Sequence, residues 1–225
     1  MIISHKYKCI FIRIPKTGST SIEKLFIEFD PECISSDNVP PYGHYNASQV
    51  KKMVSEKVWN EYYKFTIIRE PLSWFKSQYS DHMRFTHKNH KYIQILLDKK
   101  YTLEKPINNI LTKDHIMNLY ILLGKWFNGN NQKKYIDEEL DFIGKYENLD
   151  IIINKLKERF NMNNRKEYHY NKSGSEKLMY NKDSKSILKI LLKDDINYYK
   201  ILCEKQIKIL WNTKDGLYNI RLPTL

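Results

Sequence analysis

The order of apolar and polar residues predicts strands that alternate with helices. Residues 9–14 are apolar and mostly β-branched apart from Arg13, which predicts a buried strand. After a short turn, apolar residues recur from Ser21 onward at the spacing of one helix face, at Ile22, Leu25, Phe26 and Phe29. The first predicted unit is therefore a strand, a short loop and an amphipathic helix.

Two further segments show the same order. Residues 64–69 form a short segment that is apolar and β-branched between Lys64 and Arg69. A helix is predicted to begin at Pro71, because proline is tolerated in the first turn of a helix. Residues 140–149 combine a strand-like half with a helix start, and the helix continues over 151–160. Units of this kind predict an α/β fold with a central parallel sheet flanked by helices. A ligand is expected at the carboxyl ends of the strands.

The remaining segments give weaker patterns. Residues 30–42 contain three prolines and are predicted to form a loop. One helix is predicted to start near Ala47 and to continue to Trp59. Residues 114–127 alternate in a helix-like way, and 184–211 are interpreted as two helical stretches.

The composition fits a single domain that spans residues 1–225. A chain of 225 residues that is 41% apolar is long enough to bury a sizeable core. Nothing approaches the apolar run that a membrane span needs, and residues 1–5 are too short and polar for a signal peptide. Cys9, Cys33 and Cys203 show no metal or redox spacing, so we interpret them as reduced thiols of a cytoplasmic protein.

The net charge indicates a basic surface. Lys and Arg number 38 against 26 Asp and Glu, which gives a formal charge of +12. This excess either serves solubility or attracts a polyanion such as an anionic glycan or a nucleotide with several phosphates. No basic block is interleaved with aromatic residues and no usual nucleic-acid module is visible, so sequence-specific nucleic-acid binding is not predicted.

The turn after the first strand has the chemistry of a phosphate-binding loop. Its residues are Pro15, Lys16, Thr17, Gly18, Ser19, Thr20 and Ser21. N–H groups at a helix N-terminus point outward with the positive end of the helix dipole, and Lys16 adds a full charge. An ordinary turn with a Ser or Thr cap is an equal alternative. A Walker-type loop needs two glycines ahead of its lysine, whereas the glycine here follows Lys16, so a kinase or NTPase is a poor match.

A second anion-binding group is predicted at the end of the second strand. Arg69 ends that strand, and Ser77 lies two turns into the following helix. The two could meet at one anionic group, because a guanidinium fork suits a phosphate and a hydroxyl adds a further donor. The alternative is a local pair of Arg69 with Glu70.

The histidines indicate no metal. His82, His87 and His90 lie close together in the sequence, but their spacing is not that of a helical ligand pair, and no Cys or carboxylate completes a set. His44 lies in a loop ahead of the helix predicted from Ala47, and on its own such a residue is an ordinary surface histidine.

These segments resemble, in order, the motifs of sulfotransferases that use 3′-phosphoadenosine 5′-phosphosulfate (PAPS). Residues 15–21 are similar to the 5′-phosphosulfate loop of the carbohydrate-type sulfotransferases. Arg69, Pro71 and Ser77 match the family segment that binds the 3′-phosphate, although Trp74 stands where the family has a second Arg.

Two later segments also resemble this family. Residues 142–149 match a family segment with Lys145 in place of the usual Arg, and we interpret Glu147 in it as a structural partner or cap. Asn171, Lys172 and Ser173 correspond to a loop that folds over the nucleotide in the family.

The resemblance implies a P-loop nucleotide-kinase-like fold and PAPS as the sulfuryl donor, without a metal. It implies that Lys16 and the loop amides hold the 5′-phosphate, that Arg69 and Ser77 hold the 3′-phosphate, and that His44 is the general base. The implied acceptor is a hydroxyl, in this family usually that of a glycan. A P-loop-like nucleotide kinase and a non-catalytic relative that binds PAPS or a polyanion are the alternatives. The sequence indicates neither the particular acceptor nor the oligomeric state.

Overall fold

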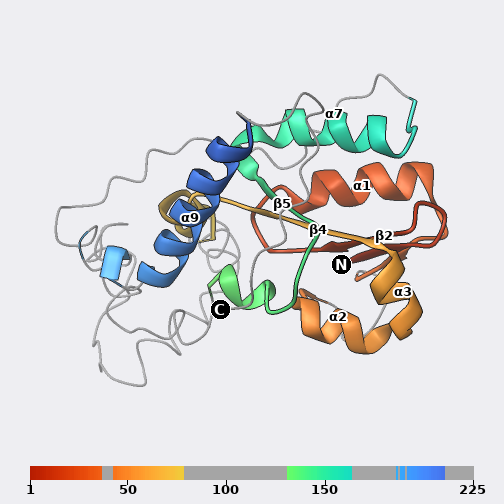
Figure 1. Cartoon of the computed structure of the whole chain (residues 1–225), viewed down its shortest axis with the longest axis horizontal. Helices are drawn as coiled ribbons and strands as arrows, with labels where there is room; N and C mark the ends of the chain where they lie inside the picture. Colours follow the sequence, from red (N-terminus) through yellow and green to blue (C-terminus); the bar gives the residue numbers. More distant parts are fainter. Residues whose placement is uncertain (37–42, 79–130, 164–185, 187, 191, 211–225) are drawn as a thin grey trace, which may run out of the picture. The chain divides into compact units, whose positions relative to one another are not determined.

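Figure 1 shows the computed structural model, which describes residues 1–36, 43–78, 131–163, 186, 188–190 and 192–210. The chain divides into two compact units. The first comprises Met1–Pro71, Asn131–Lys172 and Asp194–Leu225, and the second comprises Leu72–Asn130 and Ser173–Lys193. The prediction of a single domain stays a prediction.

The first unit contains a five-stranded mixed sheet in the order β3-β1-β2-β4-β5. Its strands are β1 Ile2–Ser4, β2 Cys9–Ile12, β3 Ile34–Ser35, β4 Tyr63–Ile68 and β5 Phe142–Lys145. The strands β2, β4 and β5 are parallel, with Phe65 opposite both Phe11 and Phe142. The strand β1 pairs antiparallel with β2 and with β3. The α/β class is therefore confirmed, but the sheet is mixed rather than all parallel.

One face of the sheet is covered by α1 (Ser19–Phe29) and α7 (Leu149–Arg159), as Figure 1 shows. Alternate strand residues such as Phe11 and Phe65 point to this face, because successive side chains of a strand lie on opposite sides. They pack with Phe26 of α1 and Ile152 of α7 in one buried cluster. The helical spacing predicted for both helices follows from this contact.

The opposite face carries α2 (Ala47–Met53) and α3 (Glu56–Glu61). Ile10 and Ile12 of β2 form a second buried cluster there with Val50 of α2 and Trp59 of α3. The sheet is thus buried on both sides, which explains why its parallel strands are almost wholly apolar.

The prediction of one helix from Ala47 to Trp59 was wrong. Val54 and Ser55 adopt extended backbone conformations, with ψ of 161° and 154°, and separate α2 from α3. The Ser55 hydroxyl accepts a hydrogen bond from the Val58 N–H (3.3 Å) and caps the second helix. The apolar spacing continued across this break because both helices pack on the same face of the sheet.

Residues 71–78 are helical, so the helix predicted from Pro71 is observed. Within the second unit Trp74 and Phe75 are buried. The last described helix, α9 (Lys193–Leu210), lies in the stretch predicted to be helical. In the part of the chain that the structure describes, no helix combines the length and apolar character needed to cross a bilayer. The helix expected at 114–127 lies outside the described residues.

Candidate functional site

The candidate site lies where the parallel strands end. The loop 13–18 follows β2, Arg69 follows β4, and Tyr146 follows β5 directly. These three strands are neighbours and run in the same direction, so their carboxyl ends share one edge of the sheet. This edge is where open α/β sheets bind ligands.

The loop after β2 turns sharply through two left-handed residues. Lys16 has φ of 62° and Gly18 has φ of 79°. The buried hydroxyl of Thr17 donates to the Ile14 carbonyl oxygen (2.9 Å), and the Ser21 N–H donates to the Gly18 carbonyl oxygen (3.0 Å). A left-handed conformation is strained for lysine and is held only where the surroundings fix it. The loop is therefore a turn that specific hydrogen bonds hold in place, and its backbone continues into α1.

Gly18 is required at its position for a second reason. A Cβ placed on it would lie 2.6 Å from Leu149 Cδ2 and 3.1 Å from Tyr146 Cδ2. The loop after β2 thus packs directly against the start of α7 and the residue that follows β5. Only glycine lets these two segments approach so closely.

The N-terminus of α1 keeps the positive character of its dipole. Its first turn carries no acidic residue, and Gly18 provides no side-chain cap. The buried carboxylate of Glu23, in the second turn, is paired with Arg13, whose Nη1 lies 2.8 Å from Oε2. The one nearby negative charge on this helix is thus matched by a cation, so the amides before it favour an anion.

Arg69 makes contacts with both neighbouring loops. Its Nη1 donates to the Lys16 carbonyl oxygen (3.3 Å), and its guanidinium carbon lies 4.3 Å from the centre of the Tyr146 ring. Burial lowers the pKa of Arg69, and nearby Tyr146, Glu147 and Glu70 act in the opposite direction. An arginine keeps its charge despite such a shift. A fixed, half-buried cation therefore lies at the end of β4 beside the loop of Lys16.

The backbone of Arg69 is held by a side chain from the segment after residue 130. Gln132 Oε1 accepts from the Arg69 N–H (2.7 Å), and Gln132 Nε2 donates to the Arg69 carbonyl oxygen (2.8 Å). The N–H groups of Gln132 and Lys133 donate in turn to the carboxylate of Asp195 at 2.9 and 3.1 Å. Burial raises the pKa of Asp195, and the hydrogen bonds from Gln132 and Lys133 oppose this shift.

His44 is exposed, and a backbone acceptor fixes its ring. The Nδ1 atom lies 2.9 Å from the Arg13 carbonyl oxygen, just beyond β2. A carbonyl only accepts, so Nδ1 carries the proton and in the neutral ring the lone pair is on Nε2. The Tyr135 ring lies edge-on, 6.5 Å from the imidazole centre. This tautomer is the one that a base working through Nε2 needs.

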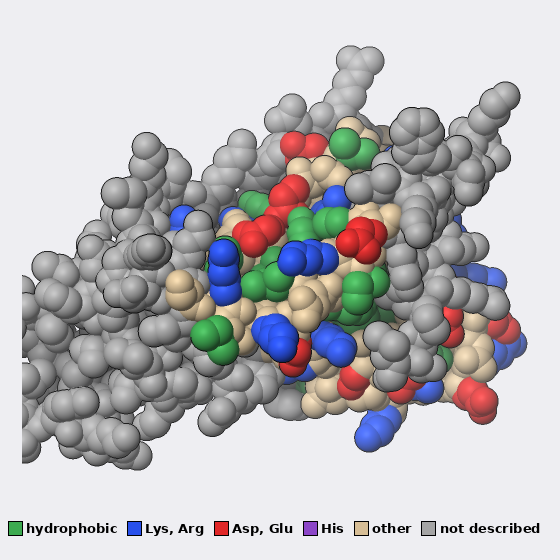
Figure 2. Space-filling model, turned by 60° about the vertical axis from the view of Figure 1, so that its left-hand side comes forward, with side chains coloured by type: hydrophobic (Ala, Val, Ile, Leu, Met, Phe, Trp, Pro, Cys, Tyr) green, Lys and Arg blue, Asp and Glu red, His purple; other side chains and the backbone are tan. Residues whose placement is uncertain are grey.

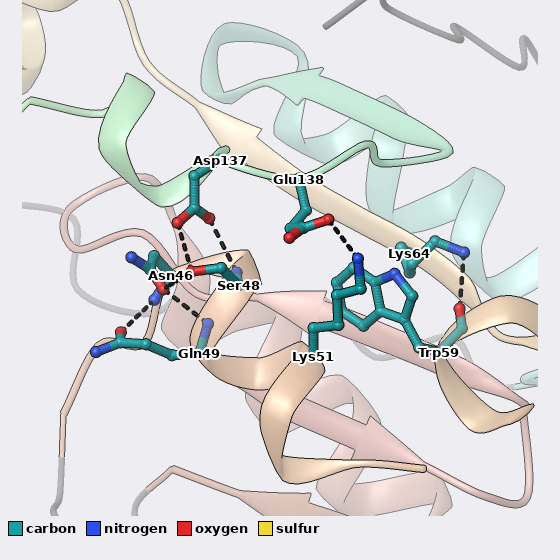
Figure 3. Close-up of polar contacts among 8 residues, drawn as sticks. All are labelled: Asn46, Ser48, Gln49, Lys51, Trp59, Lys64, Asp137 and Glu138. Carbon is teal, nitrogen blue, oxygen red and sulfur yellow. Dashed lines mark hydrogen bonds and ion pairs between the residues drawn. The ribbon is translucent and has the colours of Figure 1, made fainter. Parts of the chain in front are cut away.

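The segment that follows η2 (Lys133–Tyr135) forms hydrogen bonds to the helix after His44, as Figure 3 shows. Asn46 and Gln49 form a capping box at the start of α2. Asp137 accepts from the N–H and the hydroxyl of Ser48 at 2.9 and 2.6 Å. The carboxylate lies at a helix N-terminus, where the dipole favours it. These contacts hold α2 and the loop before it in place.

The segment after β5 completes the edge. Glu147, in η3 (Tyr146–Asn148), accepts from the Glu70 N–H through Oε1 (2.9 Å) and from the Tyr199 hydroxyl through Oε2 (2.9 Å). Burial first, and then Glu147 itself, raise the pKa of Tyr199. Glu147 therefore ties the residue after Arg69 to α9, as expected for a structural partner.

A model of the sulfotransferase family matches residues 1–211. This chain belongs to the sulfotransferase family. Comparison with curated proteins and with solved structures gave no significant match. The family predicted from the motifs is thus confirmed, and with it transfer of a sulfuryl group as the general chemistry.

In this sulfotransferase the structure brings several predicted site residues together at one sheet edge. The loop of Lys16 contacts Arg69, and His44 contacts Arg13 at the start of the same loop. Ser77 belongs to the second unit, where its side chain is buried. Residues 171–173 lie outside the described residues. The roles assigned to all of these residues stay predictions.

Sequence reasoning missed three residues of the candidate site: Gln132, Asp195 and Tyr146, whose ring packs against the Arg69 guanidinium. Gln132 lies 63 residues from Arg69 and belongs to no motif, so no signal pointed to it. Asp195 could have been suspected from its place in the first turn of a helix.

On the face that Figure 2 displays, charges of opposite sign are mixed rather than gathered. Figure 2 shows Lys and Arg side chains among Asp, Glu and apolar side chains on the face that it displays. Among the described residues no cluster of three or more His, Cys, Asp or Glu could hold a metal ion. The His82, His87 and His90 set lies outside them. The cation that the described contacts fix at the candidate site is Arg69, beside the backbone of Lys16.

Proposed function

We propose that this sulfotransferase moves the sulfuryl group of PAPS to a hydroxyl of a carbohydrate. The observation that carries the proposal is the hydrogen bond from Arg69 to the Lys16 carbonyl oxygen, 3.3 Å long. It joins the loop at the α1 N-terminus to a cation at the end of the next parallel strand. Two anion-binding groups placed side by side suit a nucleotide with separate 5′- and 3′-phosphates.

The residues fit this donor. The left-handed turn at Lys16 and Gly18 leads the backbone into the positive end of α1, which favours a 5′-phosphate. Lys16 would neutralise charge that develops on the bridging oxygen. Arg69, together with Ser77, would hold the 3′-phosphate through charge-assisted hydrogen bonds, and this phosphate distinguishes PAPS from ATP. Asn171, Lys172 and Ser173 would cover the nucleotide.

His44 would be the general base. The acceptor hydroxyl gives its proton to Nε2 while its oxygen bonds to sulfur, and the bond from sulfur to the 5′-phosphate oxygen breaks. The Nδ1–H bond to Arg13 keeps the required tautomer and stabilises the imidazolium that forms. In-line transfer of this kind is chiefly positioning and charge stabilisation, as in phosphoryl transfer, and no step of the proposal uses a metal.

A glycan acceptor is supported by the carbohydrate-type order of the loop motif. The net charge of +12 also suits an anionic or hydroxyl-rich glycan. We further propose a cytoplasmic location for the enzyme. The free thiols of Cys9, Cys33 and Cys203 support a reducing compartment.

The test is calorimetric titration with adenosine 3′,5′-bisphosphate, the expected product nucleotide. AMP, ADP and ATP serve as controls. Tight binding that requires the 3′-phosphate, and that weakens in Lys16→Ala and in Arg69→Ala, is the expected result. Equal affinity for AMP and the bisphosphate would remove the PAPS assignment, and ATP preference would favour a kinase-like protein.

A further inference from the structure

Gln132 extends the hydrogen bonding of the sheet by one residue. The strand β4 ends at Ile68, so the N–H and C=O groups of Arg69 lie beyond its bonded ladder. A side-chain amide carries an acceptor and a donor side by side, as a strand edge does. Gln132 uses both at once, at 2.7 and 2.8 Å, and only 3% of its surface is exposed. The direction in which Arg69 leaves the backbone is thereby set.

Asp195 holds Gln132 in this position. Both carboxylate oxygens accept from consecutive backbone N–H groups, those of Gln132 and Lys133. Asp195 is 3% exposed and lies in the first turn of α9, where the helix dipole stabilises a negative charge. Hydrogen bonds to a buried carboxylate are short and strong, and breaking one leaves a charge without its partners. A continuous chain of hydrogen bonds therefore links Asp195 of α9 to the backbone of Arg69.

We propose that Gln132, held by Asp195, is a positioning residue that aims Arg69 at the 3′-phosphate of the nucleotide. This inference rests on the proposed function, because it assigns that phosphate to Arg69. Tyr146 and the Lys16 carbonyl oxygen already hold the guanidinium of Arg69. Gln132 adds a restraint on the backbone of the same residue. If the backbone of Arg69 were less well held, the guanidinium would be displaced from the position in which it contacts the 3′-phosphate.

The experiment measures the ratio of affinities for adenosine 3′,5′-bisphosphate and AMP by calorimetry. Gln132→Glu keeps an acceptor for the Arg69 N–H but places an oxygen against the Arg69 carbonyl oxygen. Gln132→Met removes both hydrogen bonds while it keeps a side chain of similar length. Each variant is expected to lower the ratio about tenfold, the loss of roughly one hydrogen bond to a charged group. AMP affinity should stay within about twofold, because AMP lacks the group that Arg69 contacts.

Two controls separate positioning from general stability. Gln49→Ala removes another glutamine whose side chain bonds to the backbone, since Gln49 accepts from the Asn46 N–H (2.9 Å) at the start of α2. Asp194→Asn changes the exposed neighbour of Asp195 in the same helix turn. Both should keep the wild-type ratio even where the melting temperature falls. If Gln132→Met does not fold, Gln132→Glu and Asp195→Asn supply the measurement.

Arg69→Ala distinguishes failure of the inference from failure of the proposed function. If Arg69→Ala lowers the ratio and the Gln132 variants do not, the positioning role is overturned while the proposed function stands. If Arg69→Ala leaves the ratio unchanged, both are overturned. In the double variant, Gln132→Glu should add almost nothing to Arg69→Ala, because the two act through one group. Additive losses would also overturn the inference.

Discussion

Replacing Gly18 by alanine tests whether the loop after β2 is built as described. The new side chain meets two separate penalties. A φ of 79° costs an alanine about 1–2 kcal/mol, because Cβ then crowds the carbonyl oxygen. The Cβ would also stand 2.6 Å from Leu149 Cδ2, and forcing an extra carbon into a packed site costs about 1–3 kcal/mol.

A smaller term acts in the opposite direction. Alanine restricts the unfolded chain and thereby returns about 0.4–1 kcal/mol. The net expectation is a loss of about 3 kcal/mol in the free energy of unfolding. Tyr146 lies 3.1 Å from the same Cβ and carries Arg69 on its ring, so nucleotide affinity should fall as well. The loss in stability is measured by urea unfolding at equilibrium, with an unchanged m-value.

Two other glycines isolate the two penalties. Gly43 has φ of 151° and open space around its Cβ position, so Gly43→Ala carries only a backbone term. A Cβ on Gly144 would stand 2.6 Å from Ile152 Cδ1, and no positive φ adds to that contact, so Gly144→Ala carries only the steric term. Gly18→Ala should be the most destabilising of the three. If it is no worse than Gly43→Ala, the close packing of the loop against Leu149 is refuted.

Three further predictions concern other parts of the molecule. His44→Ala should reduce turnover about 10²–10⁴-fold with nucleotide affinity kept, as expected for a general base; full turnover in a sulfate-transfer assay would exclude that role. Asp137→Asn should cost about 1 kcal/mol of stability, because it removes the charge from the group that accepts two hydrogen bonds at the N-terminus of α2. Glu138→Gln weakens only an exposed pair with Lys51 and should cost under about 0.5 kcal/mol, so equal losses in thermal unfolding would contradict the prediction. Burial, followed by Asp30 and Glu23, raises the pKa of the Cys33 thiol to about 11 from 9.0. As the pH rises, the thiol loses its proton in the unfolded chain before it does so in the folded protein, so the free energy of unfolding should fall between pH 9 and 11. Cys33→Ala should reduce the slope of that free energy against pH by up to about 1.4 kcal/mol per pH unit. An unchanged slope in urea titrations across that range would count against it.

The sequence predicted those parts of the fold that are encoded within one short segment. The strand, loop and helix around Lys16 could be recognised because β2 is apolar, the turn residues follow at once, and α1 shows one apolar face. The short strands β1 and β3 were missed, since three and two residues are too few to show a period. Their antiparallel pairing makes the sheet mixed, and only the tertiary structure reveals it.

The candidate site was predictable to a similar extent. Lys16 and Arg69 belong to local motifs, and the parallel strands bring the Arg69 side chain to the backbone of Lys16. The support for Arg69 was not predictable, because Gln132 and Asp195 act through partners 63 residues away along the chain. A glutamine in a polar stretch has no pattern of its own. Its role depends entirely on where the second half of the chain returns to the sheet.

The pairing of Arg69 with Gln132 also bears on how this enzyme can diverge. The chain leaves the first unit after Pro71 and re-enters it at Asn131, beside the residues that are hydrogen-bonded at 2.7 and 2.8 Å. A segment whose two ends lie close together can change in length with little effect on stability, because the entropic cost of loop closure grows only slowly with the number of residues. Insertions within residues 79–130 can therefore be accommodated while Ser77 and the strand ends that carry Lys16 and Arg69 stay as they are. New acceptors could be explored in evolution by such insertions, with the proposed donor site kept intact.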